Sequence, residues 1–473
     1  MGKIKQRLML TMLNIVTVAF VTSVFGVCWL WFYAQAAQTG TWETWCVIAL
    51  FCVIYCLMCR AYDAFEVALQ GLRETVGSQL LALLVTHIIL YCVTCLLVRR
   101  AAAPLPLLAS WIVSTVCAAL WSAVKREWYF STCPAKRSVI VYDGYTNVGD
   151  MIAQYGLEKN FAVTDAVEIE ACLADMSVLD GAEVVFLSNV SSGDRNEILK
   201  YCVARNTEVY LTPRIGDTLM QSARQVRLFH LPALCVRGYQ PPVLYLALKR
   251  AFDLLASALA LLILSPVFLI TAICIKVCDG GPVFYTQERL TKGGKVFKIH
   301  KFRSMRVDAE KDGVARLSTG DCDGRITPVG RVIRKLHIDE LPQLVDILRG
   351  DLSVVGPRPE RPEIAAQYEA IMPEFRLRLQ AKAGLTGCAQ VYGKYNTRPY
   401  DKLKMDLMYI AHPSVLQDLR LCFLTVKTIF LPESTEGVAE GQTTAETDQT
   451  KRAKRETVPL NKAYAQSRLE HIS

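Results

Sequence analysis

Two adjacent carboxylates, Asp339 and Glu340, stand in the part of the sequence that is densest in charged residues and short motifs. The cations that precede them are Lys301, Arg303, Arg325, Arg331, Arg334 and Lys335. Lys301 and Arg303 are two positions apart, so their side chains share one face if the segment is extended. Carboxylates can hold Mg²⁺ against a diphosphate, and an unprotonated carboxylate can itself be a nucleophile. Cations that converge on this pair therefore predict phosphoryl-transfer chemistry.

A further cation is held rigidly in the segment Gly356-Pro357-Arg358-Pro359. The two prolines restrict the backbone on both sides of Arg358 and so fix the direction of its guanidinium. A planar guanidinium can bind two phosphate oxygens at once. We therefore expect Arg358 to bind substrate phosphate together with Lys301, Arg303 and Arg334.

A non-catalytic interpretation of the dyad stays open. Acidic residues favour the first turn of a helix, and apolar residues follow the dyad at helical spacing, at Leu341, Leu344, Val345 and Leu348. The surrounding cations could lie on anionic lipid headgroups. On this interpretation the chain is a non-enzymatic membrane scaffold or regulator.

A third interpretation rests on Asp321-Cys322-Asp323, which has the DxD form that nucleotide-sugar glycosyltransferases use to hold a metal ion. Such an enzyme would transfer the sugar without its phosphate and would release UDP. The pattern is weak, because the surrounding stretch Ser318–Arg325 is polar and follows no apolar strand. We expect these acids to be ordinary loop residues.

The composition is too apolar for one soluble domain. Of 473 residues, 52% are hydrophobic and 21% are charged, whereas soluble proteins average about 25% charged residues. The formal net charge of +9 could suit nucleic acid, anionic lipid or phosphorylated substrates, and we expect the last two and no nucleic acid. None of the 17 Cys residues has zinc-finger spacing, so free thiols in a reducing cytosol are expected.

Four apolar runs predict a transmembrane region over residues 1–126. They are Leu8–Ala34, Trp45–Leu57 (through Cys59 if extended), Leu80–Val98 and Leu105–Val124. A helix needs about 20 apolar residues to cross a bilayer. Lys and Arg before the first run and after the fourth place both ends of the region in the cytoplasm, although Arg99 and Arg100 count against that orientation.

Residues 138–235 have the alternation of a parallel α/β domain. Short β-branched runs at Val139–Val141, Val184–Phe186 and Val209–Leu211 alternate with amphipathic stretches such as Arg195–Ala204. The turn Asp143–Gly149 stands where a dinucleotide-binding loop would lie, but it lacks GxGxxG. Without those glycines nucleotide binding is doubtful, and the alternative is a structural, regulatory or dimerising module.

A fifth apolar run, Ala251–Val277, lies inside a domain expected over residues 245–431. Cations flank it on both sides, and the positive-inside rule draws both flanks to the cytoplasm. Ser265-Pro266 predicts a sharp bend, because the proline has no N–H and frees the carbonyl of Leu262. We favour a re-entrant hairpin over residues 251–277 rather than a spanning helix. The polar, low-complexity residues 432–473 predict a disordered tail.

Eight short motifs occur in an order that resembles one family. They are Lys249–Asp253, Ser265-Pro266, Gly281–Phe284, Lys301–Met305, Arg325–Thr327, Asp339–Gln343, Gly356–Pro359 and Gly384–Gly387. Over about residues 245–430 the chain resembles the bacterial polyprenyl-phosphate sugar-1-phosphate transferases, which are monotopic phosphoglycosyl transferases of surface-polysaccharide assembly. The long members of that family also carry four N-terminal spans and a degenerate nucleotide-binding-like domain, in the same plan as residues 1–234.

This resemblance implies a mixed membrane fold. Its parts would be a four-helix transmembrane region, an α/β Rossmann-like cytosolic domain and a membrane-embedded α/β catalytic domain with a re-entrant helix. The implied reaction moves sugar-1-phosphate from a UDP-sugar to undecaprenyl phosphate and releases UMP. That step would begin the assembly of an exopolysaccharide, capsule or O-antigen-type glycan.

The resemblance also implies roles for particular residues. Asp339 would attack the β-phosphorus and carry the phosphosugar covalently, and Glu340 would assist through the Mg²⁺ that the family requires and that both carboxylates would hold. Arg358 matches an arginine that contacts phosphate, and Lys301 and Arg303 match a basic motif at the same site. Ser265-Pro266 matches the break that returns the helix to the cytoplasmic face.

The expected location is the bacterial inner membrane, among its lipids, with the catalytic domain on the cytoplasmic face. A homodimer is one option for the oligomeric state. Relatives use glucose, galactose or N-acetylated hexosamines, and no residue separates these sugars. One departure is Cys388, where many relatives have Trp; it bears on the sugar or lipid pocket rather than on the chemistry.

Overall fold

The computed structural model describes residues 3–68, 70–144, 146–307, 309, 323–393 and 397–429. Asp321, Cys322 and the tail expected over 432–473 lie outside these residues. The chain divides into two compact units between Thr212 and Pro213, upstream of the limits at 235 and 245 that the sequence suggested.

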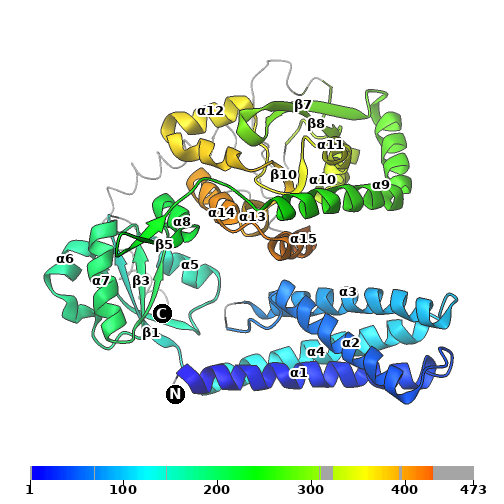
Figure 1. The fold of residues 1–473 in the computed structure, drawn as a ribbon, viewed down its shortest axis with the longest axis horizontal. Coiled ribbons are helices and arrows are strands. Elements are labelled where there is room, and N and C mark those ends of the chain that lie inside the picture. Colours follow the sequence, from blue (N-terminus) through cyan, green and yellow to red (C-terminus); the bar gives the residue numbers. More distant parts are fainter. Residues whose placement is uncertain are drawn as a thin grey trace, which may run out of the picture. The chain divides into compact units, whose positions relative to one another are not determined.

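The first unit begins with four long apolar helices, α1 (Lys3–Phe32), α2 (Thr41–Ala61), α3 (Leu72–Val98) and α4 (Leu105–Thr132) (Figure 1). With α9 in the second unit, five helices of the described chain are long and apolar enough to cross a membrane. The four predicted apolar segments are confirmed as helices, and α2 is longer than its short apolar run. The chain is therefore a membrane protein.

The interior of this helical region contains several buried polar side chains. Lys125 of α4 is fully buried, and its ammonium donates to Asn14 Oδ1 of α1 at 2.8 Å. Tyr55 of α2 donates to Gln79 Oε1 of α3 at 2.6 Å. In an apolar surrounding, such hydrogen bonds tie helices together, because the alternative is an unsatisfied polar group.

A parallel sheet follows the helices in the first unit. In the described part of this unit, its strands are β1 (Lys136–Tyr142), β2 (Phe161–Glu168), β3 (Val184–Ser188) and β4 (Glu208–Leu211), in the order β2-β1-β3-β4. All three pairings are parallel, with α5 (Val148–Gln154), α6 (Ile169–Ala174), a 3₁₀ turn η1 (Met176–Leu179) and α7 (Ser192–Ala204) between the strands. The predicted parallel α/β character is confirmed, although β2 was not foreseen; it is a mostly exposed edge strand whose apolar residues are interrupted by Thr164 and Asp165.

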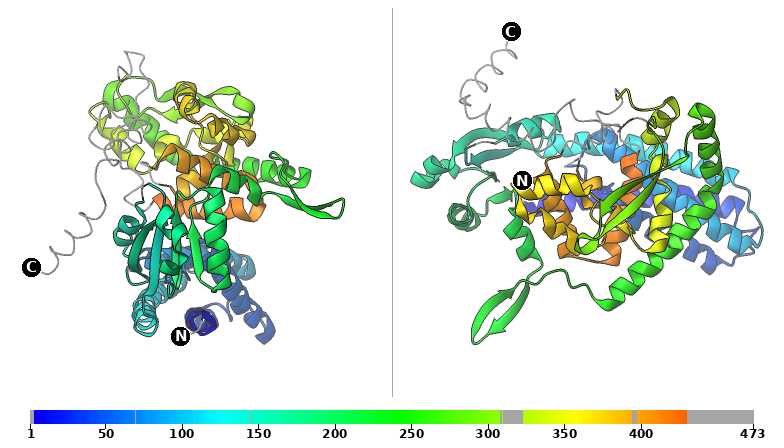
Figure 2. Two further views of the ribbon diagram at one scale, coloured as in Figure 1. Left: turned by 90° about the vertical axis from the view of Figure 1, so that its left-hand side faces the viewer. Right: turned by 90° about the horizontal axis from the view of Figure 1, so that it is seen from above.

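The second unit begins with α8 (Ile215–Gln221) and a hairpin of β5 (Arg224–Leu228) and β6 (Leu231–Cys235). The hairpin extends away from the rest of its unit (Figure 2). The 37-residue helix α9 (Val243–Asp279) follows and contains Pro266. Figure 1 shows α9 changing direction sharply, as the proline predicts. The hydroxyl of Ser265 donates to the carbonyl of Leu262 at 2.8 Å.

The remaining elements of the second unit fold against α9. In chain order they are β7 (Phe284–Leu290), η2 (Lys292–Gly294), β8 (Val296–Phe302), α10 (Pro328–Lys335), η4 (Ile338–Glu340), α11 (Gln343–Arg349), β9 (Ser353–Val355), α12 (Pro362–Ile371), η5 (Pro373–Gln380), β10 (Gly384–Thr386), α13 (Cys388–Val391), α14 (Pro399–Ala411) and α15 (Val415–Ile429). Strands β7 and β8 pair antiparallel, and β9 and β10 pair parallel.

The bend lets the two parts of α9 pack into different clusters. Before the bend, Ala260 and Leu261 pack on the cluster that contains Leu344 and Ile347 of α11. After the bend, Ile275 lies in a cluster with Phe302 of β8 and Ile333 of α10. One helix therefore supports both the strand and the helices that surround the Asp339–Glu340 dyad.

Polar contacts from the first part of α9 strengthen this support. The guanidinium of Arg250 donates to the carbonyls of Ile347 and Leu348, at 2.7 and 2.9 Å. These carbonyls lie in the last turn of α11, where the helix itself offers no amide donor. The buried carboxylate of Asp253 accepts from Ser353 Oγ at 2.9 Å and from the Val354 amide at 3.0 Å. Helix α9 is thus tied to α11, which follows the dyad, and to β9, which precedes Arg358.

Three glycines let β9 and β10 approach closely. A Cβ added to Gly384 would lie 2.1 Å from the amide nitrogen of Gly356, and one added to Gly387 would lie 2.1 Å from the Gly356 carbonyl oxygen. A Cβ on Gly356 itself would lie 2.3 Å from the carbonyl oxygen of Lys382. Each neighbour is backbone, which cannot move aside, so the glycines of these two motifs are required for close packing beside the dyad.

Candidate active site

The dyad lies in η4, a single 3₁₀ turn between α10 and α11. Helix α10 begins at Pro328 because the hydroxyl of Thr327 accepts the amide of Gly330 at 2.9 Å, which caps the helix. It ends where His337 adopts a left-handed conformation, with φ of 54°, and the chain turns. Acidic residues in this turn would also suit a simple helix start, so the surrounding contacts decide between the two interpretations.

Two cations from distant segments meet on Glu340. Lys301 Nζ of β8 lies 2.6 Å from Glu340 Oε1, and Arg358 Nη2 lies 3.0 Å from the same oxygen. Burial alone would raise the pKa of Glu340, but the two positive charges outweigh burial and hold it well below its usual value. Glu340 is therefore ionised at neutral pH, and its Oε1 binds both cations.

Asp339 behaves differently from its neighbour. Burial raises the pKa of Asp339, Lys301 opposes this rise, and the negative charge of Glu340 adds to it. The positive charge of Arg334 also lowers the pKa of Asp339. The pKa values of these two adjacent carboxyl groups are thus shifted in opposite directions.

The structure brings together three of the four predicted phosphate-binding cations. Lys301 and Arg358 bind Glu340, and the charge of Arg334 acts on the carboxyl group of Asp339. Arg303 instead forms an ion pair with Asp279 at the end of α9, with Nη1 at 2.9 Å from Oδ2, and its side chain is 7% exposed. Among the contacts of the described residues, Arg303, which directly follows β8, therefore binds the end of α9 rather than the dyad.

The second acid of the DxD motif is already paired. Both carboxylate oxygens of Asp323 accept from the guanidinium of Arg325, at 2.9 and 2.7 Å, and the side chain is 4% exposed. This pair orders the turn that leads into α10.

Two further groups near the dyad were not foreseen from the sequence. Asp346 of α11 accepts from the His300 amide at 2.9 Å and from its ring Nδ1 at 2.6 Å, which holds β8 in place next to Lys301. Arg378 of η5 donates to the carbonyl of Arg358 at 2.8 Å. Neither group belongs to a recognisable motif, and their partners are 46 and 20 residues away, so no local pattern could have revealed them.

The dyad can supply two carboxylates to a small divalent cation, and the remaining ligands must come from elsewhere. Among the described residues, no group of three or more His, Cys, Asp or Glu side chains could hold a metal ion by itself. Mg²⁺ commonly binds one or two carboxylates and takes its other ligands from substrate phosphates and water. The dyad fits that mode of binding, with substrate supplying the remaining oxygens.

Comparison with known proteins agrees with the order of motifs. Residues 244–432 match the family described as bacterial sugar transferase. A UDP-N-acetylgalactosamine-undecaprenyl-phosphate N-acetylgalactosaminephosphotransferase of Aeromonas hydrophila is 36% identical over 267 residues, which are 56% of this chain and 60% of that relative. The chain thus spans about three fifths of the length of the Aeromonas protein.

Two other relatives match over shorter stretches of the chain. The exopolysaccharide production protein PSS of Rhizobium leguminosarum bv. phaseoli is 42% identical over 190 residues, which are 38% of this chain and 94% of that relative. A UDP-glucose:undecaprenyl-phosphate glucose-1-phosphate transferase of Caulobacter vibrioides is 38% identical over 191 residues, which are 39% of this chain and 71% of that relative. This chain aligns with nearly the whole Rhizobium protein. It therefore belongs to the bacterial sugar transferases, which are the polyprenyl-phosphate sugar-1-phosphate transferase family.

Proposed function

We propose that this chain transfers sugar-1-phosphate from a UDP-sugar to undecaprenyl phosphate and releases UMP. The observation that carries the proposal is the meeting of Lys301 and Arg358 on Glu340, directly beside Asp339. A helix start needs no such convergence from two distant segments. The names of the Aeromonas and Caulobacter relatives support the choice of donor and acceptor.

The reaction proceeds in two displacements at the β-phosphorus of the donor. Lys301, Arg334 and Arg358 bind the diphosphate and neutralise its charge, which orients the phosphorus toward Asp339. A carboxylate oxygen of Asp339 forms a bond to that phosphorus, and the bond to the UMP oxygen breaks, with its electron pair leaving on UMP. An oxygen of undecaprenyl phosphate then attacks the same phosphorus and releases the Asp339 carboxylate.

The proposed cofactor is Mg²⁺, held by Asp339 and Glu340. When bound, it would neutralise phosphate charge and help to orient the donor. Glu340 is ionised and lies at the point where the two cations meet, so its carboxylate fixes their positions. The exchange replaces one phosphoanhydride by another, so the site needs orientation and charge neutralisation more than driving force.

The proposed location is the bacterial inner membrane with the site at the cytoplasmic face, where lipid phosphates meet the cytosol. The sharp bend in α9 supports a re-entrant hairpin over residues 251–277, because a bent helix can return to the side that it entered. The cations on both flanks of this segment support the same side. Membrane lipids would then surround the apolar surface of α9, where Leu255 and Leu262 are each 73% exposed.

The parallel sheet of the first unit is proposed to be a Rossmann-like module with a degenerate nucleotide site. Its strand order β2-β1-β3-β4 and parallel pairings support that interpretation. The loop after β1 has the sequence Asp143–Gly149 without the glycine pattern that lets a backbone approach a pyrophosphate. A structural, regulatory or dimerising use is proposed for it, with a homodimer as the assembly.

The test of the proposed reaction uses the full chain in detergent with Mg²⁺, undecaprenyl phosphate and a panel of UDP-sugars. We expect lipid-dependent UMP from at least one sugar. Asp339→Asn should abolish it, and Asp351→Asn, on a more exposed carboxylate that pairs with Lys295, should leave it intact. Without acceptor lipid, a donor labelled at its β-phosphate should leave label on the parent protein and not on Asp339→Asn.

The other interpretations predict different products. Release of UDP instead of UMP would indicate a glycosyltransferase. Unchanged function in Asp339→Asn, with no nucleotide released by the parent chain, would favour a scaffold or regulator.

A further inference from the structure

The backbone of the segment Pro357-Arg358-Pro359 has few N–H groups with which to form hydrogen bonds. Pro357 and Pro359 have no N–H, so the backbone on either side of Arg358 can be held mainly through its carbonyl oxygens. The Arg358 side chain is 45% exposed and reaches Glu340 from the end of this segment. The direction of its guanidinium therefore depends on how firmly those carbonyls are bound.

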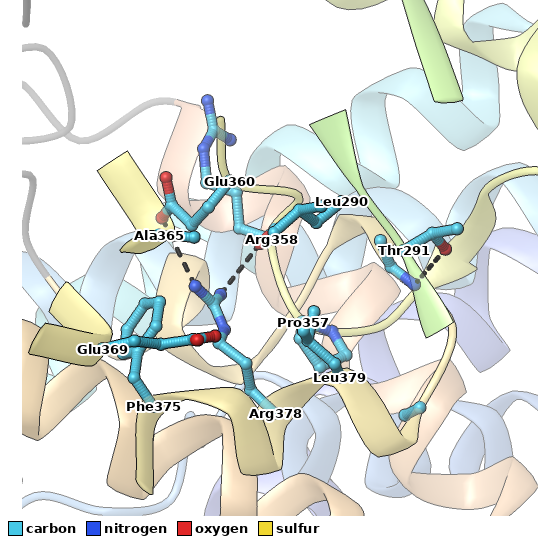
Figure 3. A pocket seen from close by; sticks show the side chains of 12 residues that line it. Leu290, Thr291, Pro357, Arg358, Glu360, Ala365, Glu369, Phe375, Arg378 and Leu379 are labelled. Atoms are coloured by element: carbon cyan, nitrogen blue, oxygen red, sulfur yellow. Dashed lines mark hydrogen bonds and ion pairs between the residues drawn. The ribbon is translucent and has the colours of Figure 1, made fainter. Parts of the chain in front are cut away.

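Four consecutive carbonyls of Pro357–Glu360 each accept a hydrogen bond from a different donor. In order, the donors are the Gly384 amide at 2.9 Å, Arg378 Nη2 at 2.8 Å, Arg289 Nη1 at 3.2 Å and the Leu290 amide at 2.9 Å. Two donors are backbone groups of β7 and β10, and two are guanidinium groups. Figure 3 shows Arg378 directed at Arg358 and Glu360. The segment is thus fixed on all four carbonyls.

Arg378 is itself held on several sides. Its Nη2 lies 2.7 Å from Asp406 Oδ2 of α14, and its Nη1 lies 3.5 Å from Glu360 Oε1. The guanidinium also lies 4.8 Å from the ring centroid of Phe375. The Arg378 and Asp406 side chains are 4% and 1% exposed. A planar guanidinium can serve a carboxylate and a carbonyl at once, which an ammonium on a flexible stem does less well.

We propose that Arg378 is a positioning residue for the transfer reaction. It sets the direction of Arg358 through the Arg358 carbonyl and does not itself contact the substrate, and Arg289 acts in the same way through Pro359. This inference rests on the proposed function. Burial of Arg378 behind the segment, with Asp406 and Glu360 as its counter-charges, supports an indirect role.

A double-mutant cycle tests this role, because a residue that acts only through Arg358 loses its effect once Arg358 is gone. The single variants are Arg378→Lys, which keeps the charge beside Asp406, and Arg358→Gln. We expect Arg378→Lys to lower the rate of UMP formation about tenfold, the size of one charge-assisted hydrogen bond. In the Arg358→Gln background, Arg378→Lys should change the rate by less than about twofold.

The matched control is Arg376→Lys, on an exposed arginine of the same helical turn. It should leave the rate unchanged in both backgrounds. Rates are measured in single turnover with excess enzyme and labelled donor, so that slow variants remain measurable. Arg289→Lys provides a second cycle with Arg358→Gln if Arg378→Lys lowers the yield of folded protein, and the same loss of effect is expected.

Additive losses in the Arg378 cycle, or in the Arg289 cycle where that one is used, would overturn the positioning role and would indicate that the arginine contacts substrate or only stabilises the fold. If the parent chain forms UMP and the losses in the cycle are additive, the proposed function still holds and only the positioning role fails. Failure of the folded parent chain to form UMP from any sugar would overturn the proposed function itself, and the positioning role with it.

Discussion

The hydroxyl of Ser265 donates a 2.8 Å hydrogen bond to the carbonyl of Leu262, the oxygen that Pro266 leaves without its usual amide donor. An α-helical amide at position 266 would normally bond this carbonyl. The serine therefore satisfies, from one residue away, the polar group that the proline exposes. This arrangement matters in an apolar surrounding, where an unsatisfied carbonyl is costly.

The bend of α9 should depend on this pair of residues. We expect Ser265→Ala together with Pro266→Ala to restore a continuous helix, so that a fraction of molecules spans the bilayer. A reporter fused to the C-terminus should then become reachable from outside the cell in part of the population. Val267→Ala, next to the bend, should leave the reporter inside. A parent chain whose reporter is reachable only from outside would contradict the re-entrant arrangement.

Lys301 should be required for the reaction because it fixes Glu340 beside Asp339. Replacement by Met removes the cation that lies 2.6 Å from Glu340 Oε1, and we expect UMP formation to fall by about 10²-fold or more. Lys298→Met, on an exposed lysine of the same strand, is the matched control and should retain the parent rate. Equal rates for the two variants would show that Lys301 is only part of a basic surface.

The acid side of the pH–rate profile should report Asp339. The nucleophile must be unprotonated, and burial raises its pKa above the ordinary value of 3.8, so the rate should fall on acidification at a higher pH than an exposed aspartate would give. Arg334 lowers this pKa, so Arg334→Gln should move the acid limb to still higher pH. Arg331→Gln, on an exposed arginine of α10, should not move it. If Arg334→Gln leaves the acid limb unchanged, the charge of Arg334 does not influence the pKa of Asp339.

Gly384 should tolerate no side chain. An added Cβ would lie 2.1 Å from the Gly356 amide nitrogen, so Gly384→Ala must push β9 and β10 apart. Overpacking of this kind costs about 1–3 kcal/mol, and we expect a Tm lower by roughly 5 °C with loss of UMP formation. Gly216→Ala, at a position where an added Cβ would have nothing within 4 Å, is the control. A Gly384→Ala chain with the parent Tm would show that the two strands can separate freely.

Much of the local structure followed from sequence patterns. Apolar runs marked all five long helices, since hydropathy depends only on neighbouring residues. The β-branched runs marked β1, β3 and β4 for the same reason, whereas the exposed edge strand β2 was missed. Pro266 marked the bend because a missing N–H is a property of the residue itself. The order of eight short motifs identified the family.

The contacts of the candidate site are of a different kind. Arg303 and Lys301 look alike in the sequence, yet Arg303 pairs with Asp279 and Lys301 with Glu340. Nothing in the sequence pointed to Arg378, which holds the carbonyl of Arg358 from 20 residues away. The sequence by itself determined the five long apolar helices, three strands of the parallel sheet and where the dyad lies, because these depend on short-range patterns. The tertiary structure decided which cation reaches which carboxylate, because that depends on how distant segments pack around α9.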